Sequence, residues 1–179
     1  MRKQTLAAVS RIALVLLAAA SLAAFTDKAK RFSVEFPQGW TDPVADDKGN
    51  VQSNGPDQDN PSWCRANSNP LASLNGSSQA ELNKTYAEPL DQPTWAGILS
   101  VDASKLKLID HEARVVNGVV VQLATLSFTQ DVLGLEAKGR FASYILPGRM
   151  VNVGCFSGTS TFPGMKASFD KVAASLKPL

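Results

Sequence analysis

Apolar residues recur at every second position in several segments of this chain, and this alternation predicts β-strands. The first such segment is 32–36, which Pro37 and Gly39 close with a turn. From residue 105 onward the strand pattern is sustained, and four long strands are expected: 106–109 leading into 112–116, then 119–128, 135–146 and 150–156. Asn117-Gly118 and Pro147-Gly148 are hairpin turns between them, so an antiparallel meander is the simplest topology.

A polar, turn-rich stretch covers 42–61, and two shorter strands are expected, one within it and one directly after it. They are 51–53 and 62–66, and the second contains Cys64 between Trp63 and Arg65. Asp, Asn, Gly and Pro dominate the residues between these two segments, which is typical of turns.

Three segments have the sequence features of helices. Ser78 and Glu81 form a capping box at the start of a helix expected at 79–88. A second, short helix is expected from Pro93, with Trp95 on its apolar side. An apolar stripe with i, i+3, i+4 spacing over 162–176 predicts a final helix that covers one face of the sheet. Together these elements indicate an α+β fold with an antiparallel β-sheet meander flanked by helices.

The N-terminal segment has the layout of a secretory signal peptide. Arg2 and Lys3 precede an apolar run from Ile12 to Ala20, and Ser21 and Ala23 are the small residues of a cleavage site. This run is shorter than the roughly 20 residues that a membrane-spanning helix needs. We therefore expect a signal peptide at 1–23, a single domain at 24–179, and a periplasmic or secreted bacterial protein with no stable membrane span after cleavage. Retention of the segment as an anchor is the alternative.

Cleavage of this segment changes the charge balance. The whole chain has 18 Lys and Arg against 16 Asp and Glu, which gives a net charge of +2. Arg2, Lys3 and Arg11 lie in the leader, so 15 basic residues remain against 16 acidic ones and the net charge becomes −1. A nearly neutral mature chain gives no reason to expect a nucleic-acid partner.

The chain has two cysteines, Cys64 and Cys155. In an exported protein the expected state of such a pair is a disulfide, and two free buried thiols are the alternative. No metal or cofactor is expected. Two cysteines and a single histidine are too few for a zinc site, and the acidic stretch at 42–59 lacks the spacing of an EF-hand calcium loop.

The ends of the expected domain carry two short motifs, F-x-V-x-F-P-x-G-W at 32–40 and F-x-x-V-x-x-S-L at 169–176. With the order of elements between them, these motifs resemble the PsbP-like superfamily of α/β/α sandwiches. That superfamily includes the PsbP extrinsic subunit of photosystem II, a nuclear-transport factor that binds the Ran GTPase, and exported bacterial relatives. The resemblance implies the fold and a role in binding partners without catalysis, but no partner-specific motif carries over to this chain.

His111 is the single histidine, and its neighbours Asp110 and Glu112 make it a candidate general base. Strand alternation instead places the imidazole and the two carboxylates on opposite faces. No G-x-S-x-G nucleophile motif accompanies them. We therefore expect no catalytic residue, and a periplasmic hydrolase that uses His111 is an alternative hypothesis.

Trp40, Trp63, Arg65 and Trp95 are the candidate ligand or partner surface. Large tryptophans either pack in the core or line a cleft between sheet and helices. The long irregular stretch before Trp63 is of the kind that carries binding surfaces. The sequence thus predicts an exported, non-enzymatic binding or assembly module with a protein partner in the cell envelope. An envelope-associated structural or stress protein is the remaining alternative.

Overall fold

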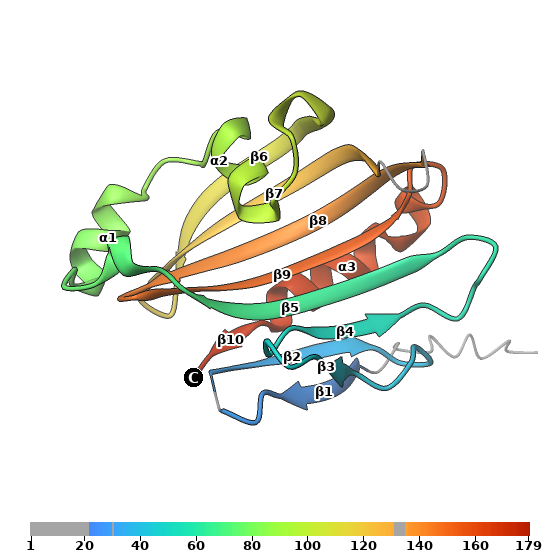
Figure 1. Ribbon diagram of the computed structural model, residues 1–179, viewed down its shortest axis with the longest axis horizontal. Coiled ribbons are helices and arrows are strands. Elements are labelled where there is room, and N and C mark those ends of the chain that lie inside the picture. The colour runs from blue at the N-terminus through green and yellow to red at the C-terminus, as the bar shows by residue number, and fades with distance from the viewer. Residues whose placement is uncertain (1–21, 30, 131–134) are drawn as a thin grey trace, which may run out of the picture.

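The computed structural model describes residues 22–29, 31–130 and 135–179, which form two antiparallel sheets and three α-helices (Figure 1). The larger sheet has the strand order β3-β4-β5-β9-β8-β7-β6 and the smaller has the order β1-β2-β10. The strands of the larger sheet are β3 (Val44–Ala45), β4 (Val51–Asn54), β5 (Ser62–Pro70), β6 (Leu106–Val116), β7 (Val119–Gln130), β8 (Leu135–Leu146) and β9 (Arg149–Gly158). Those of the smaller sheet are β1 (Leu22–Thr26), β2 (Phe32–Pro37) and β10 (Lys177–Pro178).

Strands β6 to β9 form the meander that the alternation predicts. Asn117 and Gly118 both have positive φ, at 52° and 81°, as a type I′ hairpin turn requires. The first of these strands is β6, in which 106–109 leads into 112–116 as expected, with a register shift between Leu108 and Asp110. The strand expected at 62–66 is correct but continues to Pro70 along β9.

Helix α1 (Gln79–Thr85) begins as expected: Ser78 Oγ accepts a hydrogen bond from the Glu81 N–H, and the Glu81 carboxylate accepts one from the Ser78 N–H. The expected end at residue 88 is wrong, because the helix stops three residues earlier. The side-chain amide of Gln122 in β7 donates hydrogen bonds to the carbonyl oxygens of Tyr86 and Glu88. These bonds hold residues 86–88 in a non-helical conformation. Helix α2 (Gln92–Leu99) then starts one residue before Pro93.

Helix α3 (Phe162–Ser175) covers one face of the larger sheet and contacts β8, β9 and β2. Its Phe169 and Val172 are fully buried against the smaller sheet, where Phe32, Val34 and Phe36 point inward. Helices α1 and α2 pack against β6, β7 and β8 on the opposite face. Helices therefore flank the sheet on both sides, and the expected α+β sandwich is confirmed.

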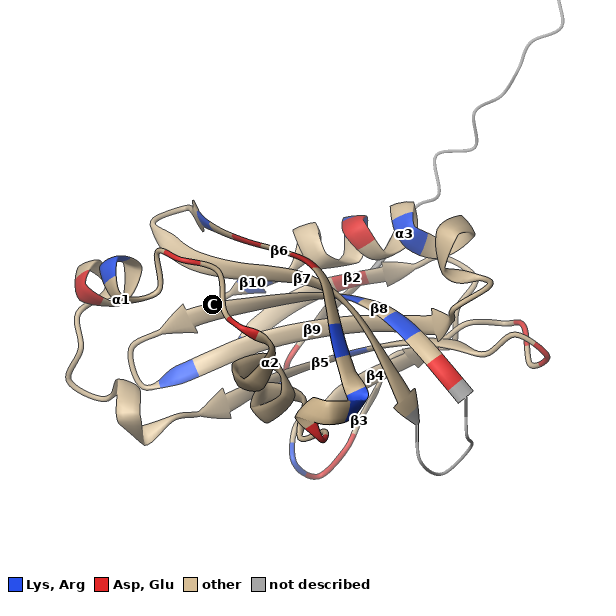
Figure 2. Ribbon diagram, turned by 90° about the horizontal axis from the view of Figure 1, so that it is seen from above, with Lys and Arg blue, Asp and Glu red and all other residues tan. Residues whose placement is uncertain are grey.

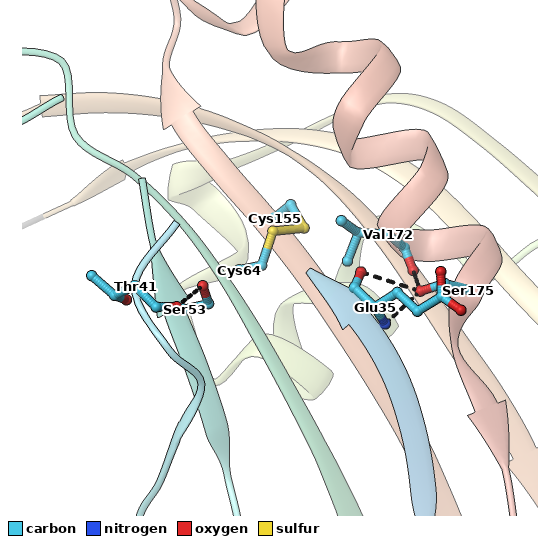
Figure 3. Close-up of a disulfide and its surroundings, with 7 residues drawn as sticks. All are labelled: Glu35, Thr41, Ser53, Cys64, Cys155, Val172 and Ser175. Carbon is cyan, nitrogen blue, oxygen red and sulfur yellow. Dashed lines mark hydrogen bonds between the residues drawn. A yellow bond between two sulfur atoms is a disulfide. The ribbon is translucent and has the colours of Figure 1, made fainter. Parts of the chain in front are cut away.

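A disulfide joins Cys64 of β5 to Cys155 of β9, as expected, with 4.0 Å between the two Cα atoms. The two residues are directly opposed in the ladder, and both side chains are buried on the α3 side of the sheet. Figure 3 shows the bond between the strands, with Val172 of α3 nearby. The same view shows Ser175, whose hydroxyl accepts a hydrogen bond from the Glu35 N–H and so ties α3 to β2.

Most of the expected signal peptide, residues 1–21, lies outside the described residues. Its last two residues, Leu22 and Ala23, belong to β1 and pair with Pro37 and Phe36 of β2. Within the part of the chain that the structure describes, no helix is long and apolar enough to cross a membrane.

Candidate functional site

A cleft of about 480 Å³ lies on the face of the larger sheet opposite α3. Helix α2 contacts β6 at one edge of this face (Figure 1). The cleft lies between α2 and the strands β5 and β9. Residues of three elements dominate its lining: Trp63, Arg65, Asn67 and Asn69 of β5; Asn152, Gly154 and Phe156 of β9; Trp95, Ile98 and Leu99 of α2. Figure 2 shows that α2 and most of β9 carry no charged residue.

Strand alternation explains why β5 contributes to both faces. Cys64 and Ala66 are fully buried towards α3, so the residues between and beside them point into the cleft. On the α3 side of the sheet, the disulfide holds β5 against β9. The positions of Trp63 and Arg65 relative to β9 are thereby fixed in register.

The floor of the cleft is aromatic at one end. Trp63 stacks on Phe156, with 5.4 Å between ring centroids and 22° between ring planes. Phe156 in turn meets Phe141 edge to face at 4.7 Å. Gly154 makes this packing possible, because a Cβ at that position would lie 2.4 Å from the Phe141 ring. These rings form a rigid apolar platform on the sheet.

The other end of the floor is polar. Asn152 donates a hydrogen bond to the side-chain oxygen of Asn67 at 3.0 Å, and Ser143 donates one to the side-chain oxygen of Asn152. These three residues are neighbours across β8, β9 and β5 in the sheet register. Each amide has two N–H donors and two acceptor lone pairs, so these contacts leave hydrogen-bonding capacity for a ligand.

Trp95 has a buried, unpartnered indole N–H among the residues that line this cleft. Its side chain is 1% exposed, and its Nε1 is buried with no hydrogen-bond acceptor among the described residues. A buried donor without an acceptor costs about 1–3 kcal/mol, and such groups are rare in native proteins. Trp95 also lines the cleft, but its Nε1 is closed to solvent, so a ligand oxygen could accept from it only if the side chain moved.

Arg65 is the one charged residue among the described residues that line the cleft. Its guanidinium lies 3.5 Å from the carboxylate of Asp46, and both side chains are about half exposed. Hydrogen bonds from the Asn50 side chain and backbone are the main reason that the pKa of Asp46 is lowered, and the charge of Arg65 contributes least. Since this exposed pair is weak, Arg65 remains available to an anionic group.

The structure brings together three of the four residues expected at a ligand surface. Trp63, Arg65 and Trp95 all line the cleft. Trp40 does not, because it lies on the other face of the sheet and packs edge to face on Phe169 of α3, with 6.3 Å between ring centroids. Trp40 is therefore part of the main core.

The hydrolase hypothesis gains no support from the geometry around His111. The imidazole Nδ1 lies 3.0 Å from the carbonyl oxygen of Leu90. Asp110 and Glu112 point to the other face, where Arg140 lies 2.9 Å from the first and 3.6 Å from the second. Arg140 Nε is also 3.0 Å from Asp170 of α3, although the N–H is not directed at that oxygen. The neighbouring carboxylates thus serve an ion cluster that does not include the imidazole.

Among the described residues, no group of three or more His, Cys, Asp or Glu side chains is arranged to hold a metal ion. In the acidic stretch, the carboxylates of Asp46 and Asp57 accept hydrogen bonds within their own turns instead of converging on one point. Asp46 accepts hydrogen bonds from its own turn, from the Lys48 and Asn50 N–H groups, and Asp57 does the same with Asp59 and Asn60. These carboxylates shape two separate turns.

Sequence reasoning missed the asparagines of the floor. Asn67 and Asn69 precede Pro70, and this composition indicates a turn when read alone. The signal that would have found them is the alternation that starts at Ser62, which places Trp63, Arg65, Asn67 and Asn69 on one face.

Comparisons with known proteins place the fold. No family model matches the chain, and no curated protein matches it by sequence. Among solved structures, cyanobacterial PsbP (CyanoP) from Synechocystis sp. PCC 6803 is similar over 97% of this chain and 99% of its own, with a TM-score of 0.56 and 15% identity. PA94 from Pseudomonas aeruginosa, described as a protein of unknown function and a putative regulator, is similar over 89% of this chain and 98% of its own, with a TM-score of 0.52 and 11% identity. The chain therefore has a PsbP-like fold, as its terminal motifs predict.

Proposed function

We propose that this PsbP-like chain is an exported, non-catalytic binding module, and that the cleft beside α2 is its binding site. One observation carries the proposal: a cleft of about 480 Å³ combines an apolar wall of Ile98 and Leu99 with the polar side chains of β5. A site with an apolar lining and a few directed polar groups is typical of a ligand-binding pocket.

Export is the second part of the proposal. The N-terminal sequence has the layout of a signal peptide, and the disulfide suits an oxidising compartment such as the periplasm. The single histidine, the residue on which the hydrolase alternative depends, contacts the backbone carbonyl oxygen of Leu90. A partner in the cell envelope fits both parts of this proposal.

Site-specific photocrosslinking in the bacterium tests the binding site. The full chain, with its leader, would carry p-benzoylphenylalanine in place of Ile98 in the cleft or, as a matched control, in place of Lys171 on the exposed side of α3. We expect a light-dependent adduct from position 98 and none from position 171. Adducts from both positions alike, or from neither, would contradict the proposal.

Cell fractionation tests export. We expect the processed chain to be released with the periplasmic or secreted fraction. Retention of the unprocessed chain in the cytoplasm would contradict this part of the proposal while leaving the binding site to be judged by crosslinking alone.

A further inference from the structure

The cleft is one section of a longer groove. A second cavity, of about 360 Å³, adjoins it on the same face and is lined in part by the same residues, Asn69, Ile98, Ser100 and Asn152. Beyond these shared residues it is mostly apolar, with Leu71 and Met150 among its lining. A compact ligand would occupy one section, whereas a linear ligand can lie along both.

The polar groups of the groove follow the repeat of an extended chain. Arg65, Asn67 and Asn69 are alternate residues of β5, so successive side chains on this face are roughly 6.6 Å apart. An extended peptide presents every second peptide group on one side with the same repeat. A side-chain amide offers both a donor and an acceptor, and so matches the N–H and C=O of a peptide group.

The remaining lining matches the other parts of such a peptide. Ile98 and Leu99 of α2 form an apolar wall that can receive alternate side chains. Arg65 adds a positive charge at one end of the asparagine row, and no acidic residue lines the groove among those described. A guanidinium suits a carboxylate, either a chain terminus or an acidic side chain.

We infer that the groove binds an extended peptide segment of a partner protein, with apolar residues at alternate positions and a carboxylate at the Arg65 end. This inference rests on the proposed function, because it names the ligand class of the same site. Aromatic rings beside amides can also bind sugars. The two-section length and the spacing of the asparagines favour a peptide, and a sugar is therefore an outcome of the test.

The three tryptophans provide the readout. In a proton–nitrogen correlation spectrum of the ¹⁵N-labelled mature protein, each indole N–H gives one signal, which a Trp→Phe variant assigns. The probe is an array of synthetic decapeptides that alternate one apolar residue with serine, each prepared with a free C-terminal carboxylate and as its amide. We expect binding peptides to move the signals of Trp63 and Trp95. Trp40, on the opposite face, is the internal control and should not move.

Variants test the role of each polar group. Arg65→Gln should lower the affinity for peptides with a free C-terminal carboxylate about tenfold, to that of the corresponding C-terminal amides. Asn67→Ala and Asn69→Ala should each weaken both kinds of peptide about fivefold, because each removes one or two neutral hydrogen bonds. Arg114→Gln, at an exposed position of β6 away from the groove, is the matched control and should change nothing.

The inference is overturned if no peptide of the array moves the Trp63 and Trp95 signals, or if chito-oligosaccharides move them instead. In either case, crosslinking from position 98 would still support the proposed function. If position 98 gives no crosslink and no indole signal moves, both the peptide inference and the proposed function are refuted.

Discussion

Gln122 is a fully buried polar residue in the middle of β7, and we predict that it is a major determinant of stability. Its amide nitrogen donates to the carbonyl oxygens of Tyr86 and Glu88 at 2.7 and 3.2 Å, and its oxygen accepts from the Leu90 N–H at 3.1 Å. Gln122→Met keeps the length of the side chain and removes all three hydrogen bonds. At about 1 kcal/mol each, their loss should lower the free energy of unfolding by about 3 kcal/mol.

Urea unfolding followed by tryptophan fluorescence measures this loss, with an unchanged m-value as the sign that the folded state keeps its compactness. Gln52→Met is the matched control, since the exposed Gln52 amide donates only to the Asn54 side chain; we expect a change within about 0.5 kcal/mol. Hydrogen exchange adds a local test, because the Leu90 amide should exchange faster in Gln122→Met. A loss below about 1 kcal/mol, or an unchanged Leu90 amide, would refute this reasoning.

Three further predictions concern the disulfide, the ion pair of Asp27 and the signal cleavage site. Replacing both Cys64 and Cys155 by Ala should lower the free energy of unfolding by about 4 kcal/mol, because the bond closes a loop of 91 residues; reductant should then have no further effect in the urea assay. Hydrogen bonds from the Arg31 side chain are the main cause of the lowered pKa of Asp27 in the folded state. The ionised Asp27 carboxylate therefore stabilises the fold at pH values above its unfolded pKa. This stabilisation disappears as the pH falls through the folded pKa. Asp27→Asn should therefore be less stable than the parent at pH 7 and equal to it near pH 2, and a difference that persists in acid would contradict this. Because Leu22 and Ala23 pair with β2, the structure favours cleavage before Leu22 over the cleavage after Ala23 that the sequence suggests. Intact mass spectrometry of the exported protein should find Leu22 retained, and a chain that begins at residue 24 would support the site expected from the sequence.

The meander and the helix starts could be predicted because their signals are local. Asn117-Gly118 sets the hairpin by its positive φ angles, and Ser78 with Glu81 sets the start of α1. The end of α1 could not be predicted in this way. It depends on Gln122, which is remote in sequence and contacts the α1–α2 connection only through the tertiary fold.

The site shows the same division. Trp63 and Trp95 were expected at a cleft because large aromatic residues near irregular segments often line one. Trp40 packs in the core, which is the other role open to a large tryptophan, because β2 belongs to a second sheet beneath α3. Asn152 and Asn67 become neighbours through the pairing of β5 with β9, which joins distant parts of the chain. No local pattern contains that pairing.

The disulfide has a practical consequence for following this protein in cells. Cys64 and Cys155 face each other only when β5 lies against β9, and the same two strands form the floor of the cleft. The oxidised bond is therefore a record that the floor has been assembled in that molecule. Alkylation of free thiols in whole cells, followed by a gel-shift assay, would count the fraction of molecules with a finished binding site without any knowledge of the ligand.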